Sequence, residues 1–139
     1  MSDPNTRSVV VDWQGGMRFA GGSPSGPSLL IDADEQEAPG PMRTLLLAAA
    51  ACSGADLVSF LAKMEVRLTR IRIQVEGQRR ADFPRRYVSI HLRFELAGEG
   101  LDETKARRAI DLSLTKYCSV VHSLNPDIPI TYDLALGSA

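Results

Sequence analysis

The sequence lacks three features that would point to particular classes of protein. Its 139 residues carry a net charge of only -1, so no basic excess indicates binding to nucleic acid or to an anionic membrane. The N-terminal segment has no apolar core like that of a signal peptide, which favours a cytoplasmic protein. Only two cysteines are present, and in a reducing compartment such a pair more often serves catalysis or sensing than structure.

The composition otherwise suits one globular domain. Hydrophobic residues make up 44% of the chain, enough to build a core without metal or disulfide cross-links. We therefore expect a single domain over residues 1–139, with residues 1–7 disordered. We expect no cofactor and no resident metal.

Alternating apolar and polar residues predict strands on both sides of a long apolar helix. Asp102 is the expected N-cap of a second helical segment, whose end beyond residue 118 is either a continuation or a short new helix. The predicted order is strands over 8–13, 17–20 and 28–32, a helix over 39–64, strands over 68–79 and 88–96, helix over 102–124, and a strand over 128–136. This order predicts an α+β fold in which antiparallel sheets are wrapped around a central buried helix.

The central helix carries one of the two cysteines. Every side chain from 45 to 51 is apolar, so the helix has no face for water and should be enclosed, with Cys52 inside the protein. Arg43, Asp56 and Lys63 interrupt the apolar run, and Asp56 would lie at a costly depth in a bilayer. A core helix of a soluble domain is therefore favoured over a membrane span.

The two cysteines are the candidates for chemistry. A buried Cys52 in apolar surroundings would have a raised pKa and be inert. Cys118 lies in a more polar sequence, near Lys116 and His122. If the sulfurs meet, one can attack an oxidant and the other can resolve the resulting sulfenic acid as a disulfide. A metal site with His122 as third ligand is the alternative, but the spacing lacks a CxxC pattern.

Two motifs carry a resemblance to a known family. Residues 41–52, with Asp56-Leu57-Val58 and Lys63 after them, look like the first cysteine motif of the OsmC/Ohr family, and residues 116–120 are similar to its second. The resemblance implies a cytoplasmic, intertwined homodimer in which each central helix crosses the interface and both chains contribute to each active site. It further implies a thiol-dependent peroxidase that acts on organic hydroperoxides and is reduced by a dithiol.

The resemblance also assigns roles to individual residues. Cys52 would be the peroxidatic thiol and Cys118 the resolving thiol. Arg18 would stabilise the thiolate and position the peroxide. The family's glutamate, which holds that arginine by a salt bridge, belongs just after the helix-starting proline, where this sequence has Met42 and Arg43.

An arginine at the glutamate's place reverses the local charge, so Arg18 should either move away or find another acid. Glu35 and Glu37, in the preceding loop, are possible substitutes. Arg43 could instead take over as the anion anchor from the helix side.

The expected substrate pocket is apolar. Leu45, Leu46, Phe60 and Phe19 are its predicted walls, which would favour organic peroxides over hydrogen peroxide. The alternative hypothesis is a non-catalytic dimer that binds an apolar or thiol-bearing small molecule, and the missing glutamate favours it.

Overall fold

The computed structural model describes residues 3–137, which form two compact units, the first extending to Leu45 and the second beginning at Leu46. Residues 3–9 contain a turn but no helix or strand, and the expectation of disorder for residues 1 and 2 lies outside the described part of the chain.

The first unit is built on a three-stranded antiparallel sheet of β1 (Val10–Trp13), β2 (Arg18–Gly22) and β3 (Ser28–Asp32) in the order β1-β2-β3. Gly15 and Gly16 both have positive φ, which lets the chain turn tightly between β1 and β2. Trp13 closes this turn by donating its indole N–H to the Gly16 carbonyl at 2.9 Å. The three predicted strands are present, with ends shifted by a few residues.

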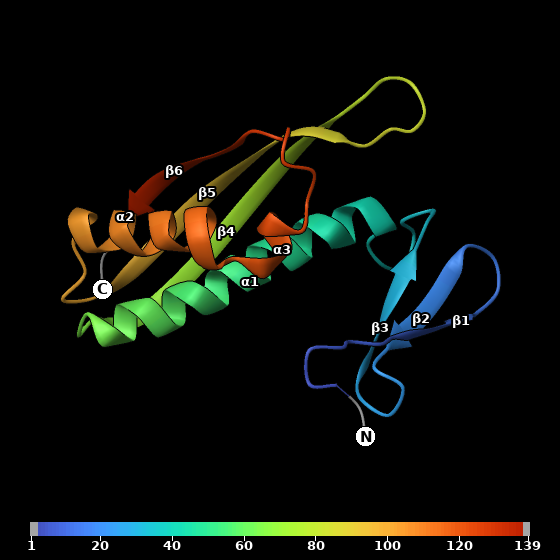
Figure 1. The fold of residues 1–139 in the computed structure, drawn as a ribbon, viewed down its shortest axis with the longest axis horizontal. Coiled ribbons are helices and arrows are strands. Elements are labelled where there is room, and N and C mark those ends of the chain that lie inside the picture. The colour runs from blue at the N-terminus through green and yellow to red at the C-terminus, as the bar shows by residue number, and fades with distance from the viewer. Residues whose placement is uncertain (1–2, 138–139) are drawn as a thin grey trace. The chain divides into compact units, whose positions relative to one another are not determined.

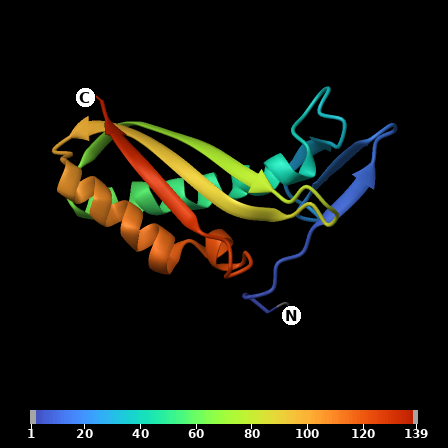
Figure 2. The same ribbon diagram turned by 90° about the horizontal axis from the view of Figure 1, so that it is seen from above.

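The second unit contains a sheet of β4 (Arg67–Arg79), β5 (Tyr87–Glu99) and β6 (Ile130–Leu136), with the helices on one of its faces (Figures 1 and 2). β4 and β5 form the predicted antiparallel hairpin. β6, however, pairs with β5 in parallel, so the sheet is mixed rather than purely antiparallel. The reason is that the helical segment between β5 and β6 acts as a crossover and returns the chain to the starting end of β5.

The core of the second unit lies between that sheet and the helices α1 (Pro41–Lys63) and α2 (Glu103–Leu112). Alternate residues of β5 face inward, and Leu92 and Phe94 are completely buried. Leu57 and Leu61 of α1 and Ile110 of α2 are equally inaccessible. The predicted α+β fold class is thus confirmed, with the predicted helix between two groups of three strands.

The enclosure expected for α1 is incomplete in the single chain. Its buried residues are Ala49, Ser53, Leu57 and Leu61, which form one stripe along the helix. Leu47 and Val58 are each 55% exposed, because the elements of one chain cover only one side of this helix. By length and composition α1 is also apolar enough to cross a membrane, a test that the core helix of a soluble protein passes too. The structure is compatible with a soluble protein.

The segment after α2 carries the second cysteine. Asp102 caps α2 as predicted, accepting a hydrogen bond from the Lys105 backbone N–H at 2.8 Å. The helix then widens into a π-helical segment, η1 (Ser113–Tyr117), and stops at Cys118, whose backbone is extended. A short new helix, α3 (Ser119–His122), follows, so the predicted segment is broken rather than continuous.

Candidate active site

The two cysteines, 66 residues apart in sequence, meet in the second unit. Cys52 lies in the middle of α1 and is half-buried, whereas Cys118 is completely buried between η1 and α3. The Cys52 side chain is near enough to the Cys118 thiol to raise its pKa, and both cysteines are free thiols. The Cys118 Sγ also lies 4.0 Å from the Ala49 carbonyl oxygen, to which it can donate. The structure therefore brings together the two thiols that the sequence singles out.

The two thiols have different surroundings, in the reverse order from that expected. Cys52, predicted to lie inside, is partly accessible because one side of α1 is uncovered. Cys118, predicted in a more polar setting, is enclosed, since Lys116 and Tyr117 point to the exterior. Burial raises the pKa of the Cys118 thiol to about 11, and the Cys52 side chain and the Asp56 carboxylate act in the same direction. Cys118 is thus a neutral thiol at physiological pH.

A buried polar chain fixes the segment that carries Cys118. Ser53 of α1 and Ser113, the first residue of η1, are both fully buried, and their hydroxyl oxygens are 2.9 Å apart. Ser113 donates to the Asp56 carboxylate at 2.9 Å, so Ser53 is the donor to Ser113. The Cys118 backbone N–H in turn donates to the Ser113 carbonyl at 2.7 Å. We call Ser53, Ser113 and Asp56 the serine–aspartate chain.

Sequence reasoning missed this chain as a functional feature. Ser53 and Asp56 are three residues apart and therefore lie on one face of α1, which was a usable signal. Ser113 gave no such signal, because serine in an amphipathic helix is most often a surface residue.

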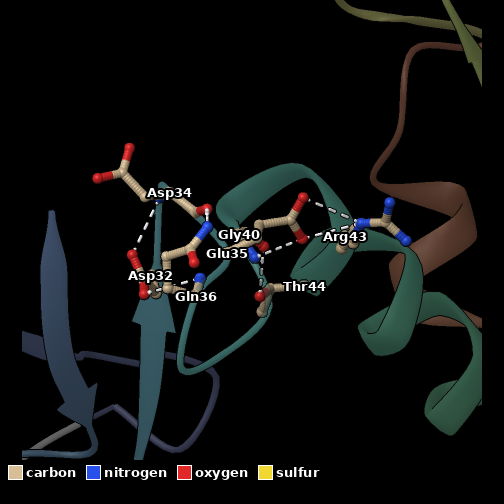
Figure 3. A network of polar contacts seen from close by, with 7 residues as sticks. All are labelled: Asp32, Asp34, Glu35, Gln36, Gly40, Arg43 and Thr44. Atoms are coloured by element: carbon tan, nitrogen blue, oxygen red, sulfur yellow. Dashed lines mark hydrogen bonds and ion pairs between the residues drawn. The ribbon is translucent and has the colours of Figure 1, made fainter.

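The predicted arginines lie in the first unit, and each has an acidic partner there. The Arg18 Nε is 3.6 Å from a carboxylate oxygen of Glu37. Arg43 contacts the Glu35 carboxylate at 2.8 Å, and Glu35 also accepts the Gly40 backbone N–H (Figure 3). The two substitute acids suggested by the charge reversal thus pair with one arginine each. Glu35 thus compensates the positive charge of Arg43, so Arg43 does not act as an uncompensated like charge on Arg18.

Asp32 at the end of β3 organises the loop that supplies these acids (Figure 3). It is 2% exposed, and its carboxylate accepts the backbone N–H groups of Asp34, Gln36 and Glu37 at 2.9 to 3.1 Å. The bond from Glu37 is the largest cause of a lowered Asp32 pKa, and the charge of Arg18 adds to it. An ionised Asp32 therefore holds the loop in place.

The predicted apolar walls are distributed between the two units. Phe19 and Leu45 of the first unit are each 37% exposed. In the second unit Leu46 is half-buried, and Phe60 packs edge-on against Tyr117, the neighbour of Cys118, with ring centroids 5.2 Å apart.

The alternative hypothesis, a metal site, lacks a set of ligands in the described part of the chain. Within residues 3–137, no three His, Cys, Asp or Glu side chains are grouped closely enough to hold a metal ion. The other histidine, His91, lies on the solvent face of β5 and contacts Thr131 and Asp133 of β6.

The fold and the cysteine pair agree with comparisons to known proteins. Residues 33–133 match the family of OsmC-like proteins, and the chain belongs to this family. It is similar to the protein YhfA of Escherichia coli K12, with 36% identity over 93% of this chain and 97% of YhfA.

Two solved structures show the same fold. The OsmC-like protein of Mycoplasma pneumoniae superposes with a TM-score of 0.82 at 18% identity, covering 96% of this chain and 99% of that one. The organic hydroperoxide resistance protein OhrB of Bacillus subtilis superposes with a TM-score of 0.62 at 19% identity, covering 94% and 98%. At such identities the likeness concerns the fold alone.

Proposed function

We propose that the protein is a thiol-dependent peroxidase that reduces organic hydroperoxides in the cytoplasm, as a defence against oxidative stress. The observation that carries the proposal is the proximity of a half-buried Cys52 to a buried, neutral Cys118, whose sulfur lies against the preceding turn of α1. The two sulfurs can therefore act in different steps. The accessible Cys52 sulfur can react with a peroxide, and the enclosed Cys118 sulfur can then form the disulfide. Membership of the family of OsmC-like proteins supports the same reaction.

The reaction balances with these two thiols. The Cys52 thiolate attacks one peroxide oxygen, the O–O bond breaks, and the alcohol leaves after taking up a proton, so that Cys52 becomes a sulfenic acid. The Cys118 sulfur then forms a bond to the Cys52 sulfur, and water leaves. An external dithiol reduces the disulfide by exchange, becomes oxidised itself and returns both thiols.

In this proposal the serine–aspartate chain positions the resolving thiol. Asp56 anchors Ser113, and the Ser113 carbonyl holds the backbone N–H of Cys118. The buried position of both serines makes this arrangement rigid, because a buried hydroxyl without a partner is costly. Cys118 is therefore held beside Cys52 before any oxidant arrives.

The proposed role of Arg18 is to stabilise the Cys52 thiolate and position the peroxide, with Glu37 in the place of the family's glutamate. The ion pair with Glu37 supports this, since it would fix the direction of the guanidinium. Arg43, neutralised by Glu35, would line the substrate side together with Leu45, Leu46, Phe60 and Phe19.

We further propose that the protein acts as a homodimer. The uncovered face of α1 supports this, because Leu47 and Val58 are more than half exposed on a helix otherwise typical of a core. A second copy packed on this face would complete the enclosure that the apolar sequence of α1 predicts.

The second candidate is a non-catalytic dimer that binds an apolar or thiol-bearing small molecule. The observation in its favour is that Met42 and Arg43 occupy the place of the family's glutamate. In that case the cysteines would be structural or would only contact the ligand.

A stopped-flow assay with cumene hydroperoxide separates the two. The peroxidase should lose one pair of thiols per equivalent of peroxide, and Cys52→Ser should abolish the reaction. Cys118→Ser should complete one oxidation and stop with a sulfenic acid on Cys52, which a dimedone adduct in the mass spectrum would reveal. Unchanged peroxide consumption in Cys52→Ser would refute the peroxidase.

A further inference from the structure

A groove at the far end of α1 carries an inference that does not depend on the cysteines. It has a volume of about 470 Å³ and lies between the last turns of α1 and one side of α2, two helices that run next to each other in both views (Figures 1 and 2). This volume falls within the range of about 300–1,000 Å³ that is usual for small-molecule sites. Neither cysteine lines it.

The groove has an apolar floor and a basic rim. Phe60, Met64 and Leu112 form the floor and are each half-buried. Lys63, Lys105 and Arg108 stand at the rim, and no acidic side chain lines the groove. Apolar surface beside charges of one sign is the arrangement that recognises an amphipathic ligand of the opposite charge.

The acids of α2 do not compensate the positive charge of the rim, because each of them has another partner. Glu103 forms an ion pair with Arg107 at 2.9 Å, and Asp111 accepts the Tyr132 hydroxyl of β6 at 2.9 Å. In the portion of the chain covered by the structure, Lys63 and Arg108 have no ion-pair partner within 4.0 Å. Two of the three rim cations are thus available to a ligand.

Lys105 has a different role at the rim. Its Nζ donates to the Gly100 carbonyl at 3.1 Å, which fixes the ammonium group at one edge while leaving its charge uncompensated. Lys105 therefore adds positive charge to the rim from a fixed position.

We propose that this groove binds a small amphipathic anion, with its apolar chain on Phe60, Met64 and Leu112 and a carboxylate head at Lys63 and Arg108. The three rim cations select an anionic head, and the limited volume of the groove restricts the ligand to a small one. Burial of the floor supplies the attraction for the chain, and the rim selects the charge.

Methyl NMR on methionine-labelled protein tests the site with octanoate as the probe. Met64 is in the groove, whereas Met17 lies in the first unit and serves as an internal control. Octanoate should shift the Met64 methyl signal in a saturable manner and leave Met17 unchanged. Octan-1-ol, which has the same chain length without the charge, should bind several-fold more weakly.

Charge-removing variants complete the test. Each of Lys63→Gln and Arg108→Gln should weaken octanoate binding about two- to fivefold, as expected for exposed ion pairs. Arg85→Gln, in the loop between β4 and β5, removes the same charge elsewhere and should change nothing. Cys52→Ser should bind octanoate like the unmodified protein, so a failure of the peroxidase would not affect this result.

Three outcomes would overturn the proposal. They are an unresponsive Met64 signal in the folded full chain, equal affinity for octanoate and octan-1-ol, and undiminished affinity in the Lys63→Gln, Arg108→Gln double variant.

Discussion

The raised pKa of Cys118 makes a quantitative prediction about its reactivity. With a pKa of about 11, roughly 0.03% of this thiol is ionised at pH 7.5, against about 10% for an ordinary cysteine of pKa about 8.5. The thiolate fraction is thus lower by about 300-fold. A thiolate of higher pKa is intrinsically more nucleophilic, which offsets about tenfold of this difference in thiol–disulfide exchange. Cys118 should therefore react about 20- to 30-fold more slowly than a free thiol, and burial slows it further.

The assay uses Cys52→Ser, in which Cys118 is the single cysteine, with a small disulfide reagent such as dithiodipyridine. Burial is the largest cause of the raised pKa and persists in this variant. The same protein unfolded in urea supplies the reference rate. The folded protein should react at least 20-fold more slowly at pH 7.5, and its rate should keep rising by about tenfold per pH unit beyond pH 9. Equal rates in the two states, or a plateau near pH 8.5, would refute the reasoning.

The remaining predictions concern stability and assembly. Ser113→Ala removes the centre of the serine–aspartate chain and should cost about 1–3 kcal/mol in urea unfolding, whereas Ser123→Ala, at an exposed hydroxyl, should stay within about 0.5 kcal/mol; equal effects would contradict the role of the chain. Leu47→Arg should shift a dimer to monomer in analytical ultracentrifugation, and an unaltered sedimentation coefficient would argue against α1 as the interface. Because its folded pKa is lowered, ionised Asp32 stabilises its loop above the unfolded pKa of about 3.9 and loses this effect as the pH falls through the folded pKa. Acid should therefore lower the hydrogen-exchange protection of the Gln36 amide, relative to the intrinsic rate at the same pH, before the second unit unfolds, and Asp32→Asn should show low protection at neutral pH as well.

Much of the fold follows from local patterns in the sequence. The alternation from Leu68 to Arg79 and the N-cap at Asp102 each depend on near neighbours in the chain, and the structure has both features. The direction of β6 could not be predicted this way, since alternating residues suit parallel and antiparallel pairing equally. That direction depends on where the helical crossover returns the chain.

In the candidate site, too, features that depend on local charges were predictable and features that depend on distant segments were not. Charge reasoning at Arg43 pointed to Glu35 or Glu37 as the acid that would compensate Arg18, and Glu37 pairs with Arg18 whereas Glu35 pairs with Arg43 itself. Cys52 was predicted inside the protein and Cys118 in a more polar setting, whereas Cys118 is the more deeply buried of the two. Burial depends on which distant segments cover each side chain, and neither sulfur's neighbours in the sequence carry that information.

The π-helical turn before Cys118 sets the rotational phase of everything that follows it. An α-helix advances by about 100° per residue, so the removal of one residue from 113–117 would rotate the downstream chain by about that angle. The sulfur would then face away from α1, even though the shortened helix could keep a full set of backbone hydrogen bonds. The extra residue of the π-helical turn thus determines the direction in which the Cys118 side chain points. An insertion or deletion in this turn would therefore be far more damaging than a substitution.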